Sequence, residues 1–193
     1  MNEHSSNDPT DPRYYGKYRG TVLDNADPEQ RGRIVAAVPD IQGALPLTWA
    51  LPCLPMAGML QGVHVVPPIG AQVWIEFEQG DVDYPVWVGG FWGSASDLPA
   101  AAGSQPPLPP SQNIVVQTAG LHLLAISDAT PMLMTSPKPA PGSPGTGGIV
   151  LRSPCGAMVV VNDAGIFINN GRGASIEMID NTVTINKSAL VVT

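Results

Sequence analysis

The chain has few charged residues, and most of those it has are acidic. Asp, Glu, Lys and Arg make up 13% of the 193 residues, and the formal net charge is −7. A general nucleic-acid-binding protein needs a basic surface, so this balance argues against that class. No hydrophobic run approaches the roughly 18 residues of a membrane-spanning helix. The polar, acidic segment 1–12 lacks the hydrophobic centre of a secretory signal, so we expect no signal peptide.

Cysteine and histidine are also scarce, which limits the possible disulfides and metal sites. Cys53 and Cys155 lie far apart in the sequence, and we interpret them as two reduced thiols. The histidines are His4, His64 and His122, and no two of them have a metal-binding spacing. We therefore predict no metal site within one chain. A cluster of three His122 side chains on the axis of an oligomer remains an alternative.

Glycine and proline are abundant, with 21 residues each. Both are poor helix formers, and no long stretch shows a clean helical period, so we predict an all-β fold. Short strands over 62–66 and 121–124 would then contain His64 and His122. The chain divides into a polar arm (1–12), a small barrel (13–93), an extended Pro-rich linker (94–112) and a strand-rich region (113–193) with a Pro/Gly insertion at 137–148.

Residues 72–93 form the most informative stretch of the sequence. Hydrophobic and polar side chains alternate from Val73 to Glu78, which is typical of a half-exposed strand. Residues 79–83 predict a turn in which Gly80 adopts a positive φ angle. A second strand is expected over 84–88, ending at Gly89-Gly90.

This hairpin resembles the closing hairpin of the OB-fold in phage baseplate assembly protein V and in VgrG-like spike proteins of contractile injection machines. Residues 13–22, 25–34, 49–53 and 67–74 match further parts of that family in the same order. The resemblance implies an OB-fold barrel over about 13–93. The hairpin residues that carry it are Trp74, Glu76, Phe77, Gly80, Asp83, Trp87, Gly90 and Trp92.

The last region contains an internal repeat. Residues 114–120 align with 149–156, and 173–181 form a shorter third copy. Each unit reads as a strand, a glycine turn, a strand and an acidic turn. Strips this narrow cannot bury their own apolar faces, and no helix is expected to cover them. We therefore predict a trimer rather than a monomer, in which each chain supplies one wall of a triangular prism.

This region is similar to the triangular β-helix of contractile-tail spikes. The resemblance implies an intertwined homotrimer whose axial core contains Ile176, Met178, Val183 and Ile185. The chain ends on residues 189–193, and three copies of Leu190, Val191 and Val192 in this end would form a hydrophobic platform. In this family a small PAAR-type tip protein covers such a platform.

The densest carboxylate cluster consists of Glu76, Glu78, Asp81 and Asp83. Glu76 and Glu78 would lie on one strand face about 7 Å apart, near the spacing of a glycosidase pair. A metal site or a surface facing a basic partner are other interpretations. We interpret the cluster as a solvated strand face that continues into a turn. No nucleophile elbow, phosphate loop or dinucleotide fingerprint occurs, so we predict no catalytic residue and no cofactor.

Together these features predict a structural, non-enzymatic spike subunit of a contractile tail baseplate, from a phage or an extracellular injection system, assembled in the bacterial cytoplasm. Its barrel would dock on a separate trimeric hub protein, and its prism would pierce the target envelope. The alternative is an OB-fold module that binds oligosaccharide or nucleic acid and carries an oligomerising stalk. A carboxylate enzyme acting on cell-wall glycans is a third class.

Overall fold

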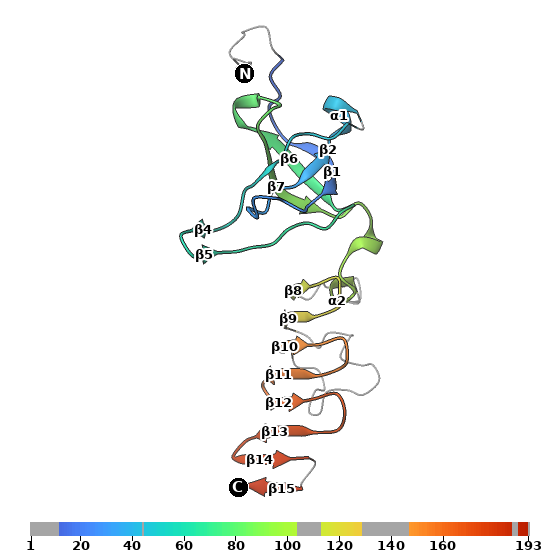
Figure 1. Ribbon diagram of the computed structural model, residues 1–193. Coiled ribbons are helices and arrows are strands. Elements are labelled where there is room, and N and C mark those ends of the chain that lie inside the picture. Colours follow the sequence, from blue (N-terminus) through green and yellow to red (C-terminus); the bar gives the residue numbers. More distant parts are fainter. Residues whose placement is uncertain (1–11, 44, 104–112, 129–146, 187–188, 193) are drawn as a thin grey trace. The chain divides into compact units, whose positions relative to one another are not determined.

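The computed structural model describes residues 12–43, 45–103, 113–128, 147–186 and 189–192. The chain divides into two compact units, residues 1–93 and 94–193, each with its own hydrophobic core. Strands dominate both units (Figure 1), so the prediction of an all-β fold is confirmed. Within the described ranges, no helix is both long enough and apolar enough to cross a membrane.

The N-terminal unit is a five-stranded sheet with the strand order β2-β1-β6-β7-β3. Two isolated bridges, Ile34 to Ala50 and Ala37 to Pro46, join the segment around β2 to the segment before β3, so the sheet curls back on itself. Its strands are β1 (Tyr18–Asp24), β2 (Val35–Ala37), β3 (Leu51–Pro52), β6 (Gln72–Phe77) and β7 (Pro85–Phe91), and the short helix α1 (Pro39–Gln42) follows β2.

Alternation along the strands builds the core of this unit. In β6, Val73 and Ile75 are fully buried, while the alternate residues Gln72, Trp74 and Glu76 are only partly buried. Trp87 from β7 enters the same core, and its indole Nε1 donates a hydrogen bond to the Gly32 carbonyl at 3.1 Å. The other buried members are Val22, Ile34, Ala36, Val38, Leu47, Ala50 and Phe77.

The predicted turn between β6 and β7 is confirmed. A 3-10 turn spans Glu78–Gly80, and Gly80 has a φ angle of 78°. A Cβ atom at Gly80 would lie 3.0 Å from the Tyr15 ring, so both the backbone angle and the lack of space favour glycine here. The expectation that the next strand ends at Gly89-Gly90 is wrong. The register shifts between Trp74 and Ile75, and this irregularity carries β7 on to Phe91.

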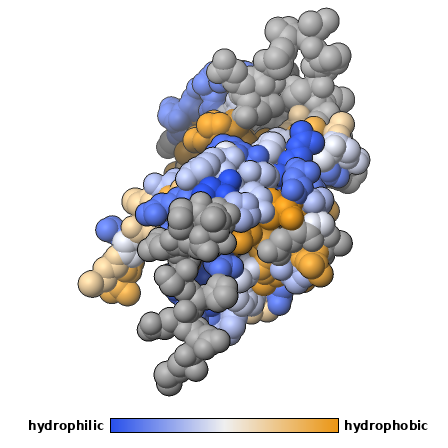
Figure 2. Space-filling model, turned by 90° about the horizontal axis from the view of Figure 1, so that it is seen from above, coloured by the Kyte–Doolittle hydropathy of each residue, from blue (hydrophilic) through white to orange (hydrophobic). Residues whose placement is uncertain are grey.

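A short hairpin projects from the N-terminal unit (Figure 1). In the part of the chain that the structure describes, its strands β4 (Ala57–Gly58) and β5 (Gln61–Gly62) pair only with each other. The turn residues Met59 and Leu60 are almost completely exposed. The projection is largely hydrophobic on its surface (Figure 2). His64 was expected in a strand over 62–66, but β5 ends at Gly62 because the described chain offers no partner strand beyond it.

The expected extended linker is partly wrong, because two short helical turns lie within it. A 3-10 turn spans Ala95–Asp97 and α2 spans Ala100–Gly103. Ser94 and Asp97 form a capping box at the start of the first turn. The arm with His4, the Pro-rich stretch 104–112 and most of the predicted insertion at 137–148 lie outside the described residues.

The C-terminal unit is an eight-stranded antiparallel sheet in which every strand pairs with its neighbours in sequence. Figure 1 shows the strands stacked one after another. They are β8 (Asn113–Gln117), β9 (Leu123–Ser127), β10 (Gly148–Arg152), β11 (Met158–Asn162), β12 (Gly165–Asn169), β13 (Ser175–Ile179), β14 (Thr182–Ile185) and β15 (Leu190–Val192).

The turns of this sheet use local side-chain hydrogen bonds. Asn162 Oδ1 accepts from the Ala164 backbone N–H at 2.9 Å and thereby tightens the connection between β11 and β12. His122 was expected inside a strand but lies in the turn before β9, because Leu121 has a φ angle of 64°. The His122 backbone N–H donates to Thr118 Oγ1 at 3.2 Å.

Candidate functional site: an uncovered hydrophobic face

One face of the C-terminal sheet is hydrophobic along its whole length. Each of the eight strands contributes two aliphatic side chains, and the cross-strand register aligns them in two columns. We call these sixteen residues the apolar face. The first column is Val116, Leu124, Leu151, Val159, Ile168, Ile176, Ile185 and Leu190, and the second is Ile114, Ile126, Ile149, Val161, Ile166, Met178, Val183 and Val192.

None of these side chains is buried within the chain. Ile114 at 62% and Leu151 at 50% are among the most exposed. The opposite face of the same strands differs, since Val150, Val160 and Phe167 are at most 2% exposed. The chain therefore buries the opposite face itself across β9 to β12 and leaves the apolar face open. An open aliphatic surface of this extent marks an interface.

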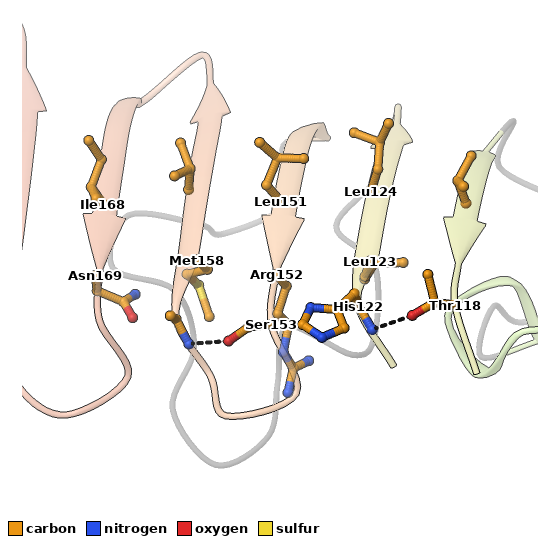
Figure 3. A pocket seen from close by; sticks show the side chains of 13 residues that line it. Thr118, His122, Leu123, Leu124, Leu151, Arg152, Ser153, Met158, Ile168 and Asn169 are labelled. Carbon is orange, nitrogen blue, oxygen red and sulfur yellow. Dashed lines mark hydrogen bonds between the residues drawn. The ribbon is translucent and has the colours of Figure 1, made fainter. Parts of the chain in front are cut away.

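Figure 3 shows part of the first column. Leu124, Leu151 and Ile168 come from three different strands and point in the same direction. They line a depression of about 530 Å³, with polar groups of His122 and Asn169 at the strand ends. Hydrophobic walls with a polar rim are typical of a surface that receives other side chains.

All four residues predicted for the trimer core lie on the apolar face. Ile176 pairs across the strands with Ile185, and Met178 pairs with Val183. Leu190 and Val192 on the same face were predicted for the tip platform, and sequence reasoning missed the other ten residues. The alternation in 114–116, 124–126, 149–151, 159–161 and 166–168 was the signal that would have identified most of them.

The predicted tip platform lies on β15, at one end of the sheet. Leu190 and Val192 belong to the apolar face and are 54% and 55% exposed. Val191 pairs with Thr184 in the ladder. Among the described strands β15 pairs with β14 alone, so no described strand occupies its other backbone edge.

The predicted carboxylate cluster is not drawn together into one site. Lys17 Nζ contacts Glu76 Oε1, and Arg13 Nη1 lies 3.3 Å from Asp81 Oδ2. Glu78 is exposed. The backbone N–H of Asp83 donates a hydrogen bond to Asp81 Oδ1 at 3.1 Å. In the described part of the chain, no group of three or more His, Cys, Asp and Glu residues is placed to hold a metal ion. Both cysteines are exposed thiols.

A buried ion pair of the N-terminal unit, between Asp27 and Arg33, lies in the turn after β1. Arg33 bonds the Asp27 carboxylate and is the main reason that the pKa of Asp27 lies far below its usual range. Backbone N–H groups of Glu29, Arg31 and Arg33 lower it further. The same contacts raise the pKa of Arg33. This pair shapes the turn within 25–34, one of the stretches that resembles the spike family.

The tryptophans of the N-terminal unit are mostly engaged in internal contacts. Trp74 packs against Phe91 with ring centroids 4.7 Å apart, and the Arg19 guanidinium lies 5.7 Å from the Trp74 ring. Trp87 is buried, whereas Trp92 is 61% exposed. A stacking platform for bases or sugars needs several open rings, and this surface offers few.

Comparison with known families agrees with both halves of the structure. Residues 18–92 match the family described as the type VI secretion system/phage-baseplate injector OB domain. Residues 113–191 match the phage baseplate V C-terminal trimerisation domain. A search of curated proteins found no match. The N-terminal unit is thus an OB domain, and the trimerisation domain supports a homotrimer. The two matches support assigning the chain to the spike components of a phage baseplate or injection system.

Proposed function

We propose that this chain is the structural spike subunit of a contractile tail baseplate, in a phage or an extracellular injection system. Three copies form a rigid spike with their C-terminal sheets. The OB domain docks on a separate trimeric hub, a PAAR-type tip protein covers the C-terminal platform, and contraction drives the spike through the target envelope. The chain performs no catalysis in this role, and it acts as a component of the assembled particle.

The apolar face is the observation that carries this proposal. Burying an aliphatic side chain contributes on the order of 1 kcal/mol or more. Sixteen such side chains in each chain therefore outweigh the stability of about 5–15 kcal/mol that a typical domain has on its own. Burying the apolar face against other chains is therefore far more favourable than leaving it exposed to water.

Three sheets with inward apolar faces satisfy the geometry of the strands. A five-residue strand spans about 16 Å, so three sheets enclose a narrow triangular core that two side chains per strand can fill. The strands cross the long direction of the sheet, and hydrogen bonds connect each strand to the next. Pushing along that direction loads many hydrogen bonds together, which suits a piercing element.

The OB domain and the end of β15 support the two partner assignments. The OB family match is to an injector component. The open edge of β15 carries exposed Leu190 and Val192, and a flat partner can continue the sheet there. The competing role as an oligosaccharide or nucleic-acid binder is supported less, because Trp74 and Trp87 are occupied by internal contacts.

Two measurements test this function. Light scattering on the purified chain should give a mass near three times 20.1 kDa. In the producing organism, loss of the chain should yield tails that fail to permeabilise target cells, and re-expression should restore permeabilisation. A monomer in solution, or fully active tails without the chain, would contradict the proposal.

A further inference from the structure

The ionisable side chains of the C-terminal sheet are sorted by edge. Successive strands run in opposite directions, so their turns alternate between the two sides of the sheet at which strands end, and we call these sides its edges. The turns after β8, β10 and β12 lie along one edge, and those after β9, β11 and β13 lie along the other. Within the described sheet, only Glu177 lies away from both edges. The basic edge carries His122, Arg152 and Arg172, and the acidic edge carries Asp128, Asp163 and Asp180.

Arg172 and the three aspartates are the groups of these edges on which the argument depends. Arg172 and the three aspartates are exposed. Within the described ranges, neither Arg172 nor any of these aspartates forms an ion pair. Opposite charges on opposite edges cannot form ion pairs within one flat sheet, because the two edges lie a full strand length apart.

We propose that the basic edge of one chain docks against the acidic edge of a second copy, and that three such contacts close the corners of the spike. This inference rests on the proposed function, because it requires the trimer. Three sheets related by a three-fold axis, with their apolar faces inward, bring opposite edges together at every corner. Complementary charge identifies the occupant of each edge as another copy of this chain.

The charge pattern also agrees with the parallel chain direction that a three-fold axis requires. A neighbour turned end over end, with its apolar face still inward, would present the same edge to its partner. Arg172 would then face basic groups, and Asp180 would face acidic ones, which is unfavourable. The apolar face alone does not distinguish these arrangements, because its two columns are equally aliphatic. The edge charges therefore disfavour a trimer in which one chain is turned end over end.

Levels along the sheet agree with this docking. Arg172 lies in the turn between β12 and β13, while Asp163 and Asp180 lie one strand before and one strand after that level. Neighbouring strands are about 4.8 Å apart, so either carboxylate of the adjacent chain is within reach of an arginine side chain. Each Arg172 therefore has two possible partners across a corner.

A charge reversal tests the contact. Arg172→Glu should raise the dissociation constant of the trimer on the order of tenfold at low salt, because each trimer loses three surface ion pairs and gains repulsion. The difference should shrink in 1 M salt, at which the Debye length is about 3 Å. Adding Asp163→Lys and Asp180→Lys to Arg172→Glu should restore stability. An unchanged trimer for Arg172→Glu at low salt would contradict the proposal.

Disulfide cross-linking tests the corner directly, with the exposed Cys155 as the probe on the basic edge. In a Cys53→Ser background, Asp163→Cys places a thiol on the acidic edge one strand level from Cys155. Oxidation should yield covalently linked dimers and trimers. Asn181→Cys is the matched control, because it lies on the same edge but three strand levels away, roughly 14 Å, beyond the reach of a disulfide.

The outcomes separate this inference from the trimer itself. If Asp163→Cys is trimeric by light scattering but does not cross-link, or if Asn181→Cys cross-links equally well, the edge-to-edge contact is wrong and the trimer stands. If the Cys53→Ser background is itself monomeric, the proposed function fails with it. Cross-linking by Asp163→Cys alone establishes the contact.

Discussion

Arg33 holds the carboxylate of Asp27 through two N–H groups. Nη2 lies 2.6 Å and Nε 3.0 Å from the same oxygen, Oδ1. The other oxygen accepts the backbone N–H groups of Arg31 at 2.7 Å and of Arg33 at 3.2 Å. The Asp27 side chain is only 3% exposed. One carboxylate therefore organises the whole turn that leads from β1 towards β2.

The OB domain should lose stability in acid through this carboxylate. The pKa of Asp27 is lowered in the folded state, chiefly by Arg33, so its contribution is fully present above the pKa of the unfolded carboxyl, about 3.9. The contribution falls as the pH drops below that value. Asp27→Asn should melt at a lower temperature at pH 7 and show less acid dependence below pH 4. Equal melting temperatures of the two proteins at pH 7 would contradict this role.

An acidic residue on the apolar face should abolish the trimer. Ile176→Asp would bury three like charges near one axis, which costs several kcal/mol for each charge. Ser175→Asp is the matched control, because the adjacent residue points to the opposite face. Light scattering should give a monomer for Ile176→Asp and a trimer for Ser175→Asp. In both variants, the fluorescence of the OB-domain tryptophans should keep its native spectrum.

Removing the last strand should separate tip binding from assembly. Deletion of residues 189–193 removes β15 but leaves seven strands of the apolar face. The trimer should persist, while co-purification with a small PAAR-type tip protein encoded nearby should be lost. If the shortened spike retains the tip protein as well as the full-length chain does, the platform does not lie at Leu190–Val192.

A side chain at Gly165 should disrupt the sheet. Gly165 begins β12 with a φ angle of 146°, and a Cβ atom would lie 2.1 Å from the Met178 carbonyl oxygen. Gly165→Ala should cost roughly 1–3 kcal/mol, because the backbone must shift away from β13. At Gly120 the nearest atom would be 3.7 Å away, so Gly120→Ala should be tolerated. Urea denaturation of the two variants measures the difference.

Sequence patterns predicted the features that depend on local alternation. The positive φ angle of Gly80 and the strands around 72–77, 114–117 and 149–152 follow from side-chain period and turn chemistry. His122 was placed in a strand because Leu121 to Leu124 is hydrophobic. Whether the ladder begins at 121 or 123 depends on pairing with β8, which composition does not encode.

The residue at which β7 ends was mispredicted for a related reason. Gly89-Gly90 is a strand breaker by propensity, but pairing with Trp74 and Val73 keeps both glycines in the ladder. The full apolar face was also missed, because it emerges only when the registers of eight strands are combined. Asp27 was visible in the sequence as part of a family stretch, yet its partner Arg33 required the geometry of the turn.

Among the described strands of the C-terminal sheet, each pairs only with its neighbours in sequence, and this order makes the spike modular. Its contacts are nearest-neighbour contacts, as in repeat proteins, so the sheet can lengthen or shorten by whole hairpins without rewiring the rest. One hairpin adds about 10 Å to the sheet at 4.8 Å per strand. A gene for such a spike can therefore tune the reach of the device by duplicating or losing a segment of some twenty residues, while the OB domain and the final strand remain unchanged.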